Sequence, residues 1–364
     1  MRIGFFTDTF LPQRNGVVTS ILSFGPELVK KGHEVFVFCP QSNVKEHRGM
    51  IVRSYPSVTF RPYPEFRIAV PRSSSDLPKL DIVHTHGPFS LGVFGLRVAK
   101  KQGVPLASTF HTMLPEYVRY LSRFGSGVLR KITWRYCRFY YNRCHEIIVP
   151  SNALKKILLQ HKIERPITVV PTGISLDFFK PIDKKKAKKK LGIYSEQVFL
   201  MLGRLGFEKN IDVVLQAFKN VNAKLIIAGR GPAERKLKNL REKLGLQKKV
   251  SFEGYVSEKL KPIYYSAADA FVIASTSETQ AIVVAESMAC GTPVVGANSF
   301  AIPEIVADGK NGFLFEPGNV EQLSEILRSY RPSKKMQIQA LKTGRKFSVE
   351  KCTKRLEKFY KSLL

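Results

Sequence analysis

Two carboxylates lie eight positions apart in the stretch STSETQAIVVAESMACGTPVV (residues 275–295), and their surroundings could bring both to one ligand. Glu278 falls in the turn after an apolar strand pattern, and Glu286 comes eight positions later within an apolar helical pattern. Residues 280–283 lie at the predicted helix start, where free N–H groups and the helix dipole favour a phosphate. Two turns later, Glu286 would face the same ligand and can bind a vicinal diol, such as a ribose, through two hydrogen bonds. A solvent-facing glutamate is the alternative, but the helix is apolar nearly all round.

A second candidate site lies in LMLGRLGFEKN (residues 200–210), which ends a strand in Gly203 and Arg204 and places Lys209 five positions later. A glycine after a strand lets a ligand approach the backbone, and arginine and lysine together can hold a diphosphate. Strand–Gly–Arg is common, and the chain has neither GxGxxG here nor a P-loop anywhere. Alone, the motif predicts only an anion site.

The loop after the first predicted strand places Asn15 and Gly16 at a helix start, which suits either a phosphate or a plain turn. His84, His86 and His111 follow other predicted strands. Zinc binding by His84 and His86 is disfavoured because no third ligand follows at a familiar spacing, so we expect no metal site. His111 is the better candidate for contacting a reacting group.

These residues need an α/β scaffold. Apolar strands such as RIGFFT, EVFVFC and DIVHTH alternate with helical patterns, and a second series with strands such as VFLMLGR, KLIIAGRG and DAFVIAS follows the lysine-dense KPIDKKKAKKK. Strands that are apolar on both faces and alternate with helices predict parallel sheets covered on both sides. We therefore expect two doubly wound domains facing a cleft, with ligands outside the carboxyl ends of the strands.

Charge is the outlier in the composition. The chain of 364 residues has a formal net charge of +30 and no apolar run long enough to span a membrane. We identify no signal peptide, and the five cysteines lack metal-ligand spacing, which indicates reduced cytosolic thiols. Such positive charge attracts nucleic acid, an anionic membrane or phosphorylated small molecules.

Part of this charge lies in residues 117–146, where basic residues alternate with aromatic ones. Basic and aromatic side chains on one helix suit a membrane interface, and each basic residue near an anionic leaflet contributes about 1 kcal/mol. A domain helix with buried aromatics and nucleic-acid binding are the alternatives. The predicted membrane contacts are Arg119, Arg123, Arg130, Lys131, Trp134, Arg135 and Arg138.

The two glutamates with the following CGTPVVGANSFAIPEIVADGKNGFLFEPGN, together with TDTFLPQRNGV, VVPTGISLDFF, GRLGFEKN and AGRGP, resemble family 4 of the glycosyltransferases over almost the whole chain. The opening and TSETQ are most similar to the subgroup that glucosylates diacylglycerol. The resemblance implies a retaining, metal-independent enzyme of GT-B fold. Its acceptor-side Rossmann-like domain would span residues 1–175 and its nucleotide-sugar-binding domain residues 176–347, and helix 348–364 can pack back on the first domain.

The resemblance also implies residue roles. Gly16 would admit the donor diphosphate, Arg204 and Lys209 would neutralise it, and His111 would lie near the transferred sugar. Sugar hydroxyls would be held by Glu278 and by the helix start, and the ribose by Glu286. The proposed substrate contacts are Asn15, Gly16, Gly203, Gln280, Ala281, Ile282 and Glu286. The family usually has glycine in place of Ala281. We expect an ordinary helix N-terminus there, where the change from glycine to alanine has only a mild effect.

We therefore expect a peripheral enzyme on the cytoplasmic face of the cell membrane that transfers glucose from UDP-glucose to a diacylglycerol-type lipid, without a cofactor and without nucleic acid as partner. A soluble acceptor or polysaccharide precursor is the first alternative. A basic nucleic-acid-binding protein is the second, but it leaves Glu278 and Glu286 without a role.

Overall fold

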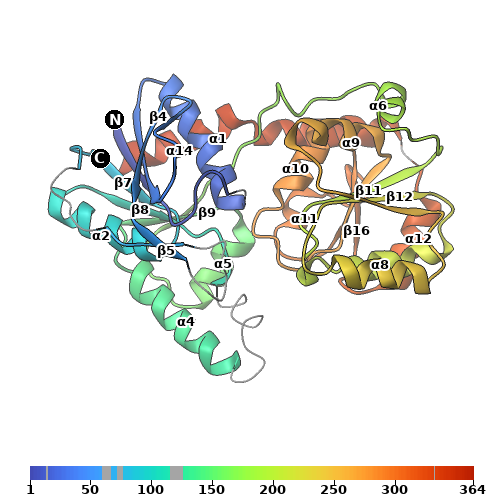
Figure 1. Ribbon diagram of the computed structural model, residues 1–364, viewed down its shortest axis with the longest axis horizontal. Coiled ribbons are helices and arrows are strands. Elements are labelled where there is room, and N and C mark those ends of the chain that lie inside the picture. Colours follow the sequence, from blue (N-terminus) through green and yellow to red (C-terminus); the bar gives the residue numbers. More distant parts are fainter. Residues whose placement is uncertain (14, 60–66, 72–76, 115–125, 332) are drawn as a thin grey trace. The chain divides into compact units, whose positions relative to one another are not determined.

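A computed structural model describes all residues except 14, 60–66, 72–76, 115–125 and 332. The chain forms two compact units, Met1–Gly173 with Val349–Leu364, and Ile174–Ser348. The first segment of the first unit ends at Gly173, two residues before the domain boundary at residue 175 that the sequence predicts. Both units are built on a mainly parallel sheet with helices (Figure 1), which confirms the α/β fold class.

The sheet of the first unit has the strand order β10-β9-β8-β7-β1-β2-β4-β3. Its pairs are parallel except β3–β4, and the short strands β5 and β6 form a separate antiparallel hairpin. The strands of this unit are β1 (Arg2–Phe6), β2 (Glu34–Pro40), β3 (Glu46–His47), β4 (Met50–Tyr55), β5 (Ser57–Thr59), β6 (Arg67–Ala69), β7 (Ile82–Thr85), β8 (Leu106–Thr109), β9 (Glu146–Val149) and β10 (Ile167–Val169). Its helices are α1 (Gly16–Lys30), α2 (Ser90–Gln102), α4 (Ser126–Tyr141), α5 (Asn152–Gln160) and α14 (Val349–Leu363).

The C-terminal helix α14 returns to the first unit and packs against α1 (Figure 1). Its buried residues Cys352, Leu356, Phe359 and Tyr360 recur at helical spacing, so one apolar stripe faces the core. The chain passes close to itself here, because a side chain at Gly173 would lie 2.5 Å from the Cα of Val349. Glycine in the motif VVPTG is therefore needed for α14 to enter this unit.

The sheet of the second unit has the order β13-β12-β11-β14-β15-β16, with every pair parallel among the described strands. Strands such as β11 are buried along their whole length, as both-sided coverage requires. The strands are β11 (Val198–Leu202), β12 (Lys224–Ala228), β13 (Val250–Gly254), β14 (Ala270–Ile273), β15 (Val294–Ala297) and β16 (Gly312–Phe315). The helices are α6 (Lys184–Lys190), η1 (Phe207–Lys209), α7 (Ile211–Ala217), η2 (Phe218–Asn220), α8 (Glu234–Lys243), η3 (Glu258–Leu260), α9 (Lys261–Ala267), α10 (Ile282–Ala289), α11 (Ile302–Ile305), α12 (Val320–Ser329), α13 (Lys334–Gly344) and η4 (Arg345–Phe347).

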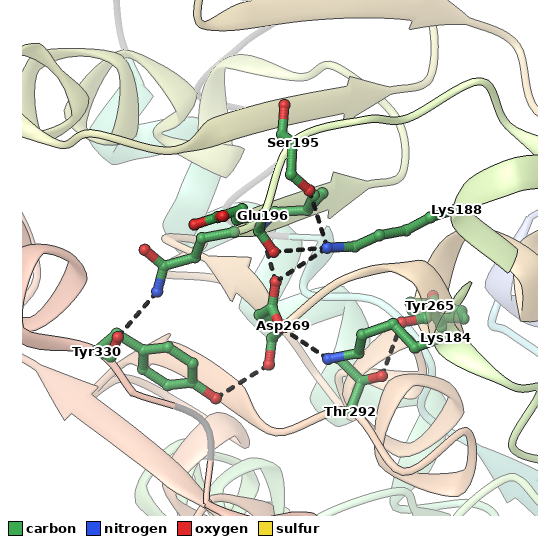
Figure 2. Close-up of polar contacts among 10 residues, drawn as sticks. Lys184, Lys188, Ser195, Glu196, Tyr265, Asp269, Thr292 and Tyr330 are labelled. Atoms are coloured by element: carbon green, nitrogen blue, oxygen red, sulfur yellow. Dashed lines mark hydrogen bonds and ion pairs between the residues drawn. The ribbon is translucent and has the colours of Figure 1, made fainter.

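The lysine-rich helix α6 is anchored by a buried carboxylate (Figure 2). Lys184 Nζ lies 2.7 Å from Oδ1 of Asp269, and Lys188 Nζ lies 3.8 Å from its Oδ2. Lys188 also donates to the carbonyl oxygens of Ser195 and Glu196. These two lysines hold α6 on the second unit, so only part of the lysine run adds to the charge that an external anion would meet.

Candidate active site

The main candidate site lies in the second unit at the carboxyl ends of β11 and β14. From β11 the chain runs to β12 and β13 on one side, and β14 to β16 lie on the other. The strand order thus reverses between β11 and β14, which is where ligands bind in open α/β sheets. Gly203 and Arg204 follow β11, and Glu278 follows β14, so the sheet places predicted site residues at the switch point.

Glycines let the loops after β11 and β12 pack backbone to backbone. A Cβ at Gly229 would lie 1.8 Å from the carbonyl oxygen of Gly203, so no side chain fits there. Gly203 itself has φ of +150°, a conformation that other residues rarely adopt, and open space at its Cβ position. The exposed backbone at Gly203 is consistent with the close ligand approach that the sequence predicts.

The predicted cations of this site are paired with carboxylates. Lys209 Nζ lies 2.5 Å from Oε1 of Glu278, which brings two of the predicted catalytic residues into direct contact. Arg204 forms an ion pair with Glu208, and its side chain stays about half exposed at 48%. A diphosphate arriving here would therefore compete with, or join, existing ion pairs.

Asn210, which the sequence analysis missed, connects the loops after β11 and β14. Its Nδ2 donates to the carbonyl oxygen of Ala274 at 3.1 Å and to Oγ1 of Thr276 at 3.3 Å. Its φ of +47° is tolerated because asparagine is among the residues that adopt the left-handed conformation most readily. The sequence signal for this role is an asparagine directly after Glu-Lys in the motif GFEKN, since asparagine readily adopts the left-handed conformation.

The expectation for Ala281 is wrong. The sequence predicts an ordinary helix N-terminus, but Ala281, which precedes α10, has φ of +58° and ψ of +52°, the left-handed conformation that favours glycine. The turn from β14 into α10 imposes this backbone, and the methyl group is buried. The alanine is therefore strained, whereas a glycine at this position would not be.

We predict that Ala281→Gly lowers the free energy of unfolding less than Ala285→Gly does, by about 1–2 kcal/mol. Both substitutions remove a buried methyl group and add the backbone entropy of glycine, but only the first relieves a left-handed alanine. Urea unfolding of the two variants measures the difference. Equal losses would show that the backbone at 281 stores no strain.

Glu286 is buried in α10, as its apolar surroundings predict, and is 5% exposed. Its Oε2 accepts a hydrogen bond of 2.8 Å from the hydroxyl of Tyr265, and its Oε1 lies 3.8 Å from Nζ of Lys261. Burial raises the pKa of Glu286, and Lys261 and the Tyr265 hydrogen bond oppose this. Gln280 is also buried, and Ile282 begins α10.

The first unit has its own switch point, between β1 and β7. Asn15, in the loop after β1, is the N-cap of α1, and its Oδ1 accepts from the backbone N–H groups of Val17 and Val18. A Cβ at Gly16 would meet nothing within 4 Å, so packing does not require glycine there. The capping role explains Asn15 without a ligand, while Gly16 leaves open space beside the backbone.

Three histidine rings form a column at the ends of β7 and β8. The rings of His84 and His86 stack with centroids 4.3 Å apart, and Nδ1 of His86 lies 2.9 Å from Nε2 of His111. Burial lowers the pKa of His111 to about 3, so this imidazole is neutral at physiological pH. Both ring nitrogens of His84 are hydrogen-bonded, to Tyr360 and Thr109. Across the described residues, no three His, Cys, Asp or Glu side chains form a group able to hold a metal ion.

Asp8, just beyond β1, is a buried carboxylate that the sequence analysis did not single out. Its Oδ1 accepts from Oγ of Ser90 and from the backbone N–H of Leu91, so it caps α2. Its buried Oδ2 has no hydrogen-bond partner among the described residues. Burial raises the pKa of Asp8 to about 6.

This shift predicts a pH dependence of stability. The stabilisation from protonated Asp8 is fully present below pH 3.8, the ordinary pKa of the group, and is lost as the pH rises through about 6. Relative to the wild type, Asp8→Asn should gain about 1.4 kcal/mol of unfolding free energy between pH 5 and pH 8. Urea unfolding at both pH values measures this change. A constant difference between the two proteins would contradict the assignment.

Comparisons with known proteins decide the family. The model described as Glycosyltransferase Family 4 matches residues 14–178, and that described as Glycosyl transferases group 1 matches residues 183–347. An alpha-monoglucosyldiacylglycerol synthase of Streptococcus pneumoniae is 34% identical over 99% of this chain and 85% of its own length. One from Acholeplasma laidlawii is 33% identical over 86% of this chain and 85% of its own length.

The chain belongs to family 4 of the glycosyltransferases. The fold agrees with this membership, because the solved structure of Anabaena Alr3699/HepE in complex with UDP matches with a TM-score of 0.81 at 20% identity over the full length of both chains. The protein is therefore a glycosyltransferase of GT-B fold.

In this family member, α4 divides its side chains between a buried and an exposed face. Trp134, Cys137 and Tyr141 are buried, and the Trp134 ring stacks on His161 with centroids 3.6 Å apart. The prediction of Trp134 as a membrane contact is therefore wrong: composition does not reveal the phase of a helix, and this ring faces the core.

The exposed face of α4 combines aliphatic and basic side chains. Val128, Ile132 and Phe139 are 64%, 57% and 56% exposed. Arg130, Lys131 and Arg135 are exposed beside them, and Arg138 is half-buried. The predicted contacts Arg119 and Arg123 lie outside the described residues. Among the helices that the structure describes, none is both long and apolar enough to cross a bilayer.

Proposed function

We propose that the protein transfers glucose from UDP-glucose to a diacylglycerol-type lipid at an anionic membrane surface. The exposed face of α4 is the observation that carries the membrane part. Exposed apolar side chains are costly in water unless a partner covers them, and here basic side chains surround them. A helix with this combination can lie in the interface of an anionic leaflet.

The lipid acceptor is supported by the names of the two relatives, which are monoglucosyldiacylglycerol synthases. UDP as the leaving group is supported by the structural neighbour solved with UDP. Nucleotide sugars and an anionic leaflet are both available on the cytoplasmic side, so we propose that the protein acts as a peripheral enzyme there.

In the proposed reaction, the bond from the sugar C1 to the diphosphate oxygen breaks, and its electron pair leaves with the diphosphate. The acceptor hydroxyl oxygen forms a bond to C1 on the same face, and its proton passes to the departing phosphate. Arg204 and Lys209 would stabilise the negative charge that develops, without a metal or cofactor. Neutral His111 would serve as a hydrogen-bonding group beside the sugar and not as a cation.

Glu278 and the backbone that precedes α10 would hold the sugar hydroxyls. Glu278 is suited to this because Lys209 keeps it close to the phosphate-binding cations. Glu286 would accept hydrogen bonds from the ribose, and Gly203 would leave room for the donor.

A matrix of donors and acceptors tests the proposal. The purified protein is incubated with UDP-glucose, UDP-galactose or GDP-mannose, and with vesicles that contain diacylglycerol or with soluble sugars. Mass spectrometry should detect hexosyl-diacylglycerol with UDP-glucose. Transfer to soluble sugars alone would overturn the lipid acceptor. Nucleic-acid binding without any transfer would overturn the proposed reaction.

A further inference from the structure

A buried tyrosine adjoins the proposed ribose-binding carboxylate. Tyr265 lies on α9, is fully buried, and donates its hydroxyl hydrogen to Oε2 of Glu286 at 2.8 Å. Its carbonyl oxygen accepts a hydrogen bond of 2.7 Å from Oγ1 of Thr292 (Figure 2), which fixes the backbone of the helix at this point. Its ring packs edge-to-face on Phe271, with centroids 5.6 Å apart. The hydroxyl is therefore held in place from several sides.

The second oxygen of the same carboxylate faces a cation. Nζ of Lys261, one helical turn before Tyr265 on α9, lies 3.8 Å from Oε1 of Glu286 and 3.0 Å from Glu258. The Lys261 distance is too long for a direct hydrogen bond, so Oε1 accepts none from this cation, whereas Oε2 already accepts one from Tyr265. Lys261 also favours the ionised form of Glu286, which burial disfavours.

We infer that Tyr265 is a positioning residue for Glu286, because its hydroxyl occupies Oε2 and orients the carboxylate so that Oε1 is presented to the ribose hydroxyls of the donor. This inference rests on the proposed function. A freely rotating carboxylate would have to be ordered when the nucleotide binds, and ordering a side chain at that moment costs affinity. The tyrosine removes this cost in advance.

The test uses Tyr265→Phe, which keeps the ring and removes only the hydroxyl. Affinities for UDP and for 2′,3′-dideoxy-UDP, which lacks the ribose hydroxyls, are measured by calorimetry. The wild type should bind UDP about tenfold more tightly than the dideoxy nucleotide, as expected for hydrogen bonds to a charged group. Tyr265→Phe should weaken UDP binding about five- to tenfold and leave dideoxy-UDP binding unchanged.

Tyr264→Phe is the matched control, because Tyr264 is the neighbouring tyrosine of α9 and lies only partly in the core. It should bind both nucleotides like the wild type. In a Glu286→Ala background, adding Tyr265→Phe should change neither affinity, since the residue acts through the carboxylate.

Different results separate the inference from the function on which it rests. If Tyr265→Phe weakens the binding of UDP and of dideoxy-UDP equally, or does not weaken UDP binding, the positioning role is overturned. The proposed glucosyl transfer would not be affected by that result. An unchanged penalty in the Glu286→Ala background would also overturn the positioning role. Failure of the wild type to bind UDP at all would overturn both.

Discussion

Replacing Arg204 by alanine is expected to lower kcat by about 10²–10³-fold, the loss typical of one charge-stabilising group in an active site. Arg204 follows β11 at the switch point of the second unit, and its half-exposed side chain is paired with Glu208, a pair that an arriving diphosphate would compete with or join. The loss should appear in kcat more than in KM, because the charge on the leaving group is greatest in the transition state.

Steady-state kinetics with UDP-glucose and diacylglycerol vesicles measure this effect. Arg204→Lys should recover only part of the activity, because lysine keeps the charge but loses the planar fork that binds phosphate through two hydrogen bonds. Arg235→Ala on α8 is the control for loss of a surface arginine and should have wild-type rates. Wild-type turnover in Arg204→Ala would remove Arg204 from the mechanism.

The second large effect concerns the membrane. Exchanging Arg130, Lys131 and Arg135 for glutamine should lower the partition coefficient onto anionic vesicles about 10²-fold, since each basic residue near the surface contributes about 1 kcal/mol. Ile132→Ser and Phe139→Ser should weaken binding further, because they remove apolar area that would be buried in the interface.

Vesicle flotation at low and physiological salt measures the partition. Exchanging Lys185, Lys189 and Lys190 for glutamine is a control with the same loss of charge on the exposed side of α6. That variant should float like the wild type if α4 contacts the membrane. If the net charge of the protein alone drives binding, the variant should bind more weakly. Equal losses in the two variants would contradict a specific role of α4, and unchanged flotation in both would contradict membrane binding by charge.

Strand positions could be predicted because their signal is local. The apolar runs VFLML, KLIIA and AFVI become β11, β12 and β14, since a strand buried on both faces needs apolar residues at successive positions. The same logic placed Arg204 and Glu278 after their strands. It did not reveal the short β3 or the hairpin β5–β6, because their residues carry little apolar pattern. The ion pair between Lys209 and Glu278 joins two distant loops, and a local pattern does not show such a contact.

Backbone conformation and helix phase were harder to predict. The left-handed conformation of Ala281 is set by the turn into α10, and alanine carries no local signal for it. The burial of Trp134 depends on which face of α4 meets the core, which a mixed basic and aromatic composition does not specify. Tyr265 was missed because its contact with Glu286 joins two helices, and a single sequence shows no such pairing.

Arg204 and Lys209, as fixed cations, are proposed to allow a nucleoside diphosphate to leave the sugar without a divalent ion. The most direct test of this proposal is the initial rate of glucosyl-diacylglycerol formation from UDP-glucose, measured in excess EDTA and again with added Mg²⁺ or Mn²⁺. We expect the same rate within about a factor of two under all conditions, since fixed charges in the site would already supply the stabilisation. Loss of the product in EDTA, with recovery on addition of a divalent ion, would contradict the proposal.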